Sequence, residues 1–277
     1  MLFLLFFIFY LSAPGDFPAG SIINIKDGAT LRSVSRELKS ENIIRSRAVF
    51  ETLSIIFGGE KHMVSGDYLF EKKVSVWEVA RRLSSGERHL MPVKITIPEG
   101  YNLEEMAKIF SLKLPKFSES DFLASAKKSY LFPDTYFFLT TDTEREVIKA
   151  MADNFNKKIS GIMPDIIRSG KSEKDIIIMA SLIEGESKGE EDRDIISGIL
   201  WRRLGMDMPL QVDSAPETYK TKGLPKEPIS SPGMESIKAA IYPKSSPYLY
   251  YLHDKDGNVH YAKTFEEHKL NKAKYLK

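Results

Sequence analysis

The order of apolar residues between Ser172 and Glu186 predicts a single helix that is buried on every side. From Ile176 to Ile183 every residue except Ser181 is apolar, so this helix keeps hardly any face for solvent. The residue that follows this apolar run is Glu184. At about 100° per residue, Glu184 lies within about 20° of Ile177, and we expect it to project from a side that is otherwise packed.

This position of Glu184 favours acid–base chemistry. A carboxyl group on a packed face loses hydration, and that loss stabilises its neutral, protonated form near neutral pH. General acid catalysis requires such a protonated group. A second interpretation is a helix-end glutamate that pairs with Lys188, four residues further along. Helical geometry alone leaves both interpretations open.

A strand–turn–helix pattern occurs twice in the first half of the chain. The segment NIKDGATLRSVSREL at 24–38 returns 72 residues later as TIPEGYNLEEMAKIF at 96–110, and the two align without a gap. Each copy has strand-like alternation, an acidic residue followed by glycine, and apolar residues at helical spacing. Two copies are too few for a solenoid, so we interpret them as a duplicated small α+β unit.

The residues between the two copies complete a compact module. Helical spacing is present at 48–57 and 74–83, and strand-like alternation at 64–70. Residues 21–90 are therefore expected to form a β-α-α-β-α module. Packing or spacing is one role for such a unit, and binding of a polymer is another.

Residues 91–277 predict a larger domain of mixed helices and strands, which makes the fold class α+β. The expected elements before the buried helix are a helix at 118–126, an aromatic segment at 130–138 and a helix from Thr143. After it we expect a helix at 194–204 and an irregular Gly- and Pro-rich stretch at 205–232. The chain then continues with a helix that has Ser231 as N-cap and Pro232 as its first residue, a hairpin around Asp256-Gly257, and a last helix capped by Thr264. Irregular stretches of this kind often carry functional sites.

Composition excludes several classes of function. The 277 residues suffice for two domains, and a net charge of +2 without a basic, aromatic-rich cluster gives no support for nucleic-acid binding. The absence of cysteine excludes thiolate nucleophiles, disulfides and thiolate metal sites.

The N-terminus predicts a location outside the cytoplasm. Residues 1–11, MLFLLFFIFYL, are unbroken in apolar character, but they cover only about half of the hydrocarbon core of a bilayer. No Lys or Arg precedes them, so the basic region of a signal peptide is missing. Two interpretations stay open for residues 1–13: the outer half of a membrane anchor whose start lies upstream, or an incomplete signal-like segment. In both, we expect the remainder of the chain to be exported.

The chemistry that remains is that of carboxylates beside polar and aromatic groups. The chain has no HExxH motif, no P-loop and no G-x-S-x-G motif. Its histidines lack metal-ligand spacing, although His253, His260 and His268 could come together by folding, and we expect no metal and no cofactor. Aromatic side chains with one desolvated acid suit carbohydrate, whose glycosidic oxygen needs protonation to leave. The tyrosines of 248–251 also fit a strand with high β-propensity and no further role.

Five segments, in order, resemble one family, the endolytic murein transglycosylases (the MltG or YceG-like family). They are ITIPEGYNLEEMA at 95–107, YLFPDTYFF at 130–138, IIIMASLIEGES followed by LWRRLGMDMPLQVD within 176–213, GLPKEPISSPGMESIKAA at 223–240, and PYLYYLHDKDGNVHYAKTFEEH at 247–268. The resemblance covers about residues 22–270. It implies a LysM-like module over residues 21–90 and a transglycosylase catalytic domain over residues 91–277.

The resemblance also implies a reaction. Such enzymes cut glycan strands of peptidoglycan internally, between N-acetylmuramic acid and N-acetylglucosamine, and leave a 1,6-anhydro end without hydrolysis. One glutamate acts first as general acid and then as general base, and Glu184 takes that position here. The implied setting is a single-pass anchor in the cell membrane with the catalytic domain on the periplasmic or extracytoplasmic side. Implied partners are peptidoglycan strands and proteins of cell-wall synthesis or division.

Further site residues follow from the same resemblance or lie in the same segments. Glu186 matches a second acidic position of the family, although on a continuous helix it points about 200° away from Glu184. Gln211 and Asp213 match the family's L-Q-x-D, and Tyr219 and His260 are polar aromatic candidates for holding sugar. The candidates for substrate binding are therefore Glu186, Gln211, Asp213, Tyr219 and His260.

The chain departs from the family between Asp213 and Tyr219, where it is shorter and where Glu217 replaces an asparagine. Two alternatives therefore stay open. One is a non-catalytic scaffold that binds peptidoglycan. The other is a muramidase with two carboxylates, in which Asp213 or Glu217 lies about 5–9.5 Å from Glu184.

Overall fold

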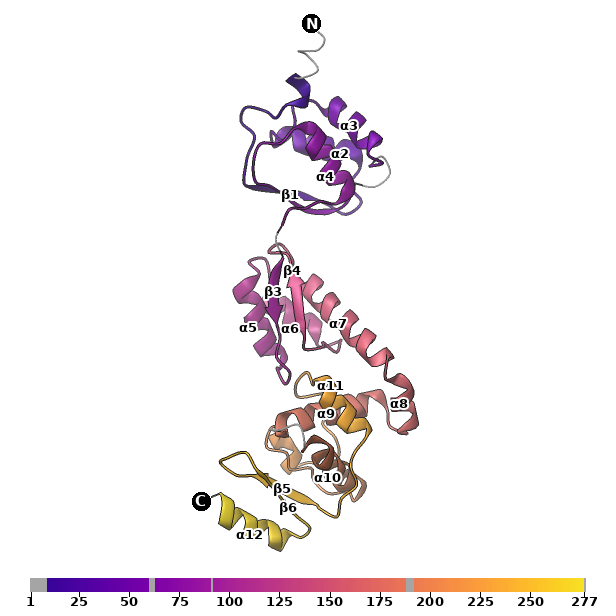
Figure 1. Cartoon of the computed structure of the whole chain (residues 1–277), viewed down its shortest axis with the longest axis vertical. Coiled ribbons are helices and arrows are strands. Elements are labelled where there is room, and N and C mark those ends of the chain that lie inside the picture. The colour runs from indigo at the N-terminus through magenta and orange to yellow at the C-terminus, as the bar shows by residue number, and fades with distance from the viewer. Residues whose placement is uncertain (1–8, 60–62, 91, 188–191, 277) are drawn as a thin grey trace. The chain divides into compact units, whose positions relative to one another are not determined.

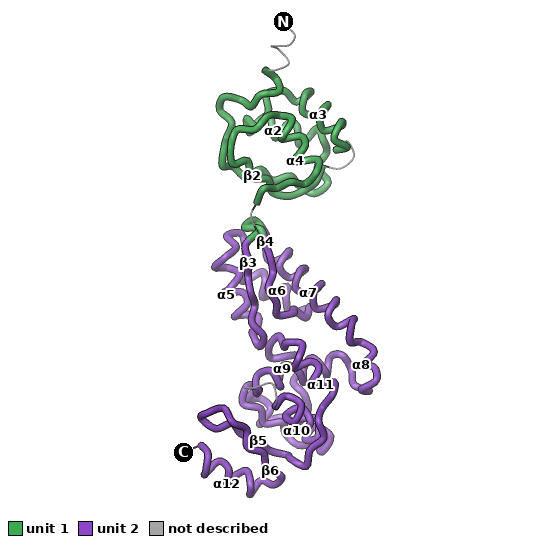
Figure 2. Tube along the Cα trace, viewed as in Figure 1, with its two compact units in different colours: residues 1–92, 139–141 green, residues 93–138, 142–277 purple. Residues whose placement is uncertain are grey.

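The computed structural model describes residues 9–59, 63–90, 92–187 and 192–276. The chain divides into two compact units, residues 1–92 with 139–141 and residues 93–138 with 142–277 (Figure 2). The first predicted segment, residues 1–13, lies mostly outside the described residues. Within the described part of the chain, no helix combines the length and the apolar character needed to cross a membrane.

The first unit has the element order β-α-α-β-α, as predicted for residues 21–90. Its elements are β1 (Ser21–Ile25), α2 (Leu31–Ser40), α3 (Arg47–Ile56), β2 (Gly66–Phe70) and α4 (Val76–Ser85). Strands β1 and β2 pair antiparallel, with Ser21 opposite Phe70 and Ile25 opposite Gly66. The helices bury one apolar face each against this pair, around Phe50 and Tyr68, which are fully buried.

The second unit begins with the same five elements. They are β3 (Val93–Thr96), α5 (Leu103–Lys113), α6 (Glu119–Ala126), β4 (Thr135–Phe138) and α7 (Glu144–Ser160), and β3 pairs antiparallel with β4 (Figure 1). The sequence predicted only a repeated strand, turn and helix, so the structure extends the duplication to the whole module.

Helix starts correspond between the two copies. Thr30 and Asn102 are the N-caps of the first helices, Ser46 and Ser118 those of the second, and Ser75 and Thr143 those of the third. Each side chain accepts a backbone N–H of the first turn, which satisfies a donor that the helix leaves free. Each of the three helices therefore begins with a capping side chain in both copies, even where the apolar residues between the caps differ.

The N-cap of α7 gives a testable stability difference. Thr143 and Glu146 form a capping box. The side chain of each accepts a hydrogen bond from the backbone N–H of the other. We expect Thr143→Ala to lower the free energy of unfolding by about 1 kcal/mol, measured by urea denaturation. Thr143→Ser keeps the hydroxyl and should retain most of the stability, whereas equal losses in both variants would contradict a capping role.

The rest of the second unit is built around one buried helix. Helix α9 (Glu173–Glu186) packs against α11 (Met234–Ile241) and α10 (Arg193–Gly205), and the eight residues from Ile176 to Ile183 are all buried (Figure 1). The prediction of a helix without a solvated face is confirmed. The remaining elements are α8 (Met163–Arg168), the 3₁₀ helix η1 (Pro216–Tyr219), the hairpin β5 (Tyr250–His253) and β6 (Val259–Ala262), and α12 (Phe265–Tyr275).

One predicted helix start is wrong. Helix α11 begins at Met234 with Gly233 as its N-cap, rather than at Pro232 with Ser231 as the cap. The backbone of Ser231 is used elsewhere, because its N–H donates to the carbonyl of Tyr101 and its carbonyl accepts from Gly100, both at 2.9 Å. This pairing holds residue 231 in an extended connection, so the helix starts only after it.

Candidate active site

Glu184 lies in the last turn of α9 and its side chain is only 9% exposed. Its Oε2 accepts a hydrogen bond from the backbone N–H of Gly233 at 3.0 Å, and its Oε1 lies 3.8 Å from Nη2 of Arg193. Gly100 is also close, because a Cβ added there would lie 3.5 Å from Cγ of Glu184. Three segments far apart in the sequence therefore enclose this carboxyl group.

The N-terminus of α11 explains the contact with Gly233. The first N–H groups of a helix have no partner inside the helix, and the helix dipole favours negative charge there. Ser181, one turn before Glu184, accepts the N–H of Ile229 at 3.1 Å and so fixes the chain that leads into α11. The helix start is thereby aimed at the Glu184 carboxyl group.

Glu99 is a second carboxyl group at this site, and the sequence analysis missed it. Its side chain is exposed overall, but its carboxyl end lies over the α-carbon of Gly233, where any Cβ would overlap it. Partial loss of hydration raises the pKa of Glu99, and the neighbouring Glu184 raises it further, while Arg193 lowers it. The available signal was the acidic residue before Gly100 in the second copy, which had been interpreted only as part of a turn.

Glu186 points to the opposite side of α9 and has partners of its own. Its Oε1 accepts from the backbone N–H and the hydroxyl of Ser214 at 3.1 and 3.0 Å, and its Oε2 accepts from the Tyr251 hydroxyl at 3.0 Å. Loss of hydration around the Tyr251 hydroxyl, together with the charge of Glu186, raises the pKa of Tyr251 well above its ordinary value. These bonds tie the loop after α10 to the hairpin.

The bond from Tyr251 to Glu186 should contribute measurably to stability. Tyr251→Phe removes one hydrogen bond to a carboxylate and should lower the free energy of unfolding by about 1.5–3 kcal/mol in chemical denaturation. Tyr248→Phe is the matched control on the same hairpin, because Tyr248 stacks on Tyr261 through its ring. If both variants lose the same amount, the hydroxyl of Tyr251 is not the cause.

Gln211, Asp213 and Tyr219 lie in the same loop as Ser214. Oε1 of Gln211 accepts from Nη2 of Arg203 at 2.5 Å, and Asp213 accepts from the Tyr219 hydroxyl. Burial of the Tyr219 hydroxyl and its bond to Asp213 raise the pKa of Tyr219 to about 12. This segment thus brings Asp213 and Tyr219 near Glu186 and Tyr251, whereas Gln211 bonds Arg203. Glu184 instead lies beside Glu99 and Arg193.

His260 lies in the hairpin and contacts the end of the chain. Its Nε2 is 2.8 Å from Oδ2 of Asp254, and its ring stacks on Tyr275 with centroids 3.5 Å apart. The hydrogen bond to His260 is the main reason why the pKa of Asp254 falls to about 2. These contacts are all within the hairpin and α12, and none joins His260 to Glu184. Lys188, the alternative partner of Glu184, lies outside the described residues.

Comparison with known proteins shows the family of the chain. The profile of the YceG-like family matches residues 23–217 and 216–274. The chain belongs to the YceG-like family.

Similar proteins match most of the chain. An endolytic murein transglycosylase of Bacillus subtilis is 29% identical over 92% of this chain and 84% of its own length. One of Streptococcus pneumoniae is 24% identical over 92% of this chain, which spans 58% of that relative. The crystal structure of a YceG-like protein from Listeria monocytogenes is similar, with a TM-score of 0.60, 26% identity, and coverage of 91% of this chain and 99% of that one.

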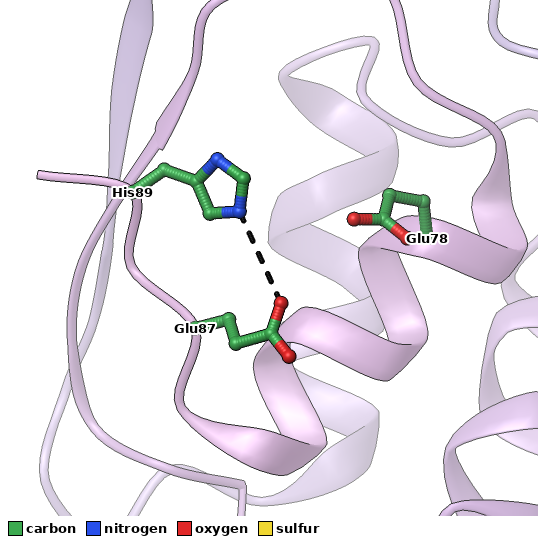
Figure 3. Close-up of side chains that lie close together, drawn as sticks. All are labelled: Glu78, Glu87 and His89. Carbon is green, nitrogen blue, oxygen red and sulfur yellow. Dashed lines mark ion pairs between the residues drawn. The ribbon is translucent and has the colours of Figure 1, made fainter.

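Among the residues that the structure describes, this YceG-like chain also has one cluster with the donor set of a cation site. In the first unit the ligand atoms of Glu78, Glu87 and His89 lie within 4.8 Å of one another, and Figure 3 shows His89 facing Glu87. Arg81 already bonds both carboxylates, at 2.9 Å to Glu78 and 2.7 Å to Glu87, and these bonds lower the pKa of each glutamate. We therefore interpret the cluster as an ion-pair network around Arg81.

Proposed function

We propose that this chain cleaves peptidoglycan glycan strands internally, as an endolytic murein transglycosylase, with Glu184 as its general acid and base. The observation that carries the assignment of Glu184 is its carboxyl group at the end of the buried helix α9, held by the Gly233 N–H and beside Arg193. The reaction class is supported by membership of the YceG-like family and by relatives that carry this name.

In the proposed reaction, Glu184 first donates a proton and later accepts one. Protonated Glu184 gives its proton to the oxygen that links C1 of N-acetylmuramic acid to the next sugar, and the C1–O bond breaks with its electron pair on that oxygen. The 6-hydroxyl of the same muramic acid attacks C1, and its proton passes to the Glu184 carboxylate. The products are a 1,6-anhydro end, a free hydroxyl end and a glutamic acid ready for another cycle.

The neighbours of Glu184 can stabilise its ionised form, which exists after the first proton transfer. When the proton has left, the carboxylate is stabilised by the Gly233 N–H at the helix start and by the Arg193 guanidinium. Glu99 opposes that charge, because two adjacent carboxyl groups do not readily ionise together. We therefore assign Glu99 to opposing the negative charge that Glu184 acquires when it gives up its proton.

A muramidase remains the second candidate, because Glu99 is a second carboxyl group beside Glu184. Asp213 and Glu217, which the sequence suggested as partners, lie in the loop on the Glu186 side of α9: Asp213 bonds Tyr219, and Glu217 is exposed on η1. A hydrolase needs its second carboxyl group ionised, as nucleophile or as base. Loss of hydration and the neighbouring Glu184 raise the pKa of Glu99, and both causes oppose the ionised form that this role requires.

The products decide between the two reactions. The chain is incubated with purified glycan strands, and the new ends are identified by mass spectrometry. We expect internal fragments with anhydro ends, which are lighter than reducing ends by one water molecule. Reducing ends would mean hydrolysis, and Glu99→Gln and Glu217→Gln would then identify the second carboxylate. Strand binding without cleavage would indicate the scaffold.

The place of action is a further part of the proposal. Peptidoglycan lies outside the cytoplasmic membrane, so we place the catalytic domain there, with residues 1–13 as the anchor or signal-like segment.

A further inference from the structure

A cavity of about 540 Å³ opens in the second unit next to the Glu184 group. Three segments line most of it: residues 102–104 at the start of α5, residues 126–131 after α6, and residues 227–232 before α11. Ile177 of α9 also lines it. Its volume lies within the range of pockets that bind small ligands, about 300–1,000 Å³. None of Glu184, Glu99 and Arg193 lines it, so it is a neighbouring site rather than the same one.

The cavity and the Glu184 carboxyl group share two structural elements. Ile177 and Glu184 are seven residues apart on α9, so they lie on one face of the helix about 10 Å apart along its axis. Ser231, which lines the cavity, is paired with Gly100 and Tyr101, and two residues later Gly233 binds Glu184. A ligand that occupies the cavity is therefore within reach of a substrate bound at Glu184.

The lining combines apolar walls with charges of both signs. The walls include Leu131 and Ile229, and the ring of Tyr130 packs on Phe155 with centroids 5.0 Å apart. The charged residues of the lining, all exposed, are Glu104, Lys127, Lys128 and Glu227. Glu227 forms an exposed ion pair with Lys174, which a ligand can displace at little cost. A neutral sugar forms no ion pairs with these four charged groups, whereas a ligand that carries an ammonium group and carboxylates can pair with all of them.

Peptidoglycan contains such a ligand at the right distance. Each N-acetylmuramic acid carries a short peptide on its lactyl group, with alanine methyls, carboxylates and usually the amino group of a diamino acid. An extended peptide advances about 3.3–3.6 Å per residue, so three residues span the roughly 10 Å from Glu184 to Ile177. The muramic acid whose bond is cut at Glu184 can thus place its own peptide in the cavity.

We propose that this cavity binds the stem peptide of the muramic acid residue whose glycosidic bond is cleaved. Lys127 and Lys128 bind its carboxylates, Glu104 and Glu227 bind its ammonium group, and the apolar walls contact its methyl groups. The inference rests on the proposed function, and it makes the enzyme select strands that still carry peptides.

Peptide binding is tested without cleavage, on the whole chain with Glu184→Gln. The probes are the synthetic tetrapeptide L-Ala-γ-D-Glu-L-Lys-D-Ala and its diaminopimelate counterpart, titrated by calorimetry. We expect the double variant Lys127→Glu/Lys128→Glu to weaken binding at least about tenfold. The matched control, Lys108→Glu/Lys113→Glu on the exposed side of α5, should bind as before. A second variant, Ser129→Trp, adds a large side chain to the exposed part of the lining without changing charge and should also weaken binding.

Cleavage then tests selection of substrate. The otherwise wild-type chain and its Lys127→Glu/Lys128→Glu variant are compared on strands with peptides and on strands stripped by an amidase. We expect a lower KM for strands with peptides, and loss of this difference in the variant while kcat/KM on stripped strands is kept. An equal loss on both substrates would show that the cavity binds sugar, and no change on either would show that it binds no substrate. Peptide binding by a chain that cleaves neither strand would refute the proposed function and leave the peptide site standing.

Discussion

Glu184→Gln should lower the rate of glycan-strand cleavage by about 1,000-fold or more. Glutamine has nearly the same shape, and its amide oxygen can still accept the Gly233 N–H, so the site should keep its structure. It cannot give a proton to the glycosidic oxygen or take one from the 6-hydroxyl, and a positioned acid–base group contributes about 10²–10⁴-fold to a rate. Initial rates on purified strands measure the loss, and thermal denaturation checks that the variant is folded.

Glu186→Gln is the matched control on the same helix. Its partners are Ser214 and Tyr251 rather than Gly233 and Arg193. The amide oxygen of Gln can accept from Ser214, and its NH2 group can donate to the Tyr251 hydroxyl oxygen in place of the bond that the carboxylate accepts. We expect less than about a tenfold loss. The reverse result, with Glu186→Gln inactive and Glu184→Gln active, would transfer the catalytic role to Glu186.

Glu99→Gln should move the alkaline limb of the rate–pH profile to lower pH and so lower the rate on that limb. The sign follows from charge. Ionised Glu99 repels a charge on Glu184, so it opposes loss of the last proton from the pair, and the neutral amide removes that repulsion. At acidic pH both carboxyl groups of the natural chain are protonated, so the rate there should change little.

Two further variants separate the charge of Glu99 from its position. Gly233→Ala adds a Cβ where the Glu99 carboxyl lies, so it should displace that group and shift the limb in the same direction by a smaller amount. Glu266→Gln, on exposed α12, removes a distant charge and should leave the profile in place. An unmoved limb in Glu99→Gln would show that Glu99 does not titrate with Glu184.

Local sequence predicted the elements because helices and strands have fixed periods. The apolar residues of α9 cover every side of a 3.6-residue helix, so only a buried helix accommodates them. The β-α-α-β-α order of the first unit was likewise readable from spacing and turn residues. The duplication was only partly visible, because the gap-free match does not extend through the whole module. The second copy is four residues shorter between the N-caps of its second and third helices: Ser46 and Ser118 are 72 residues apart, and Ser75 and Thr143 are 68 apart.

The start of α11 shows where local signals fail. Ser231 and Pro232 have the chemistry of a cap and a first helical residue, yet two backbone hydrogen bonds to residues 100 and 101 hold Ser231 in the preceding connection. No local pattern contains that information, because the competing partner lies about 130 residues earlier in the chain.

The sequence by itself determined the mixed α+β fold, the buried helix α9 and the side from which Glu184 projects. Each of these depends on the period of one segment and on which residues exclude water. Only the tertiary structure decided that Gly233, Arg193 and Glu99 surround Glu184, and that Glu186 belongs with Ser214 and Tyr251. These partners lie in separate segments of the chain. The packing of α9 against α11 and against residues 93–160, the second copy of the module, brings them together. Packing of that kind depends on shape across the whole unit, so spacing along the chain does not encode it.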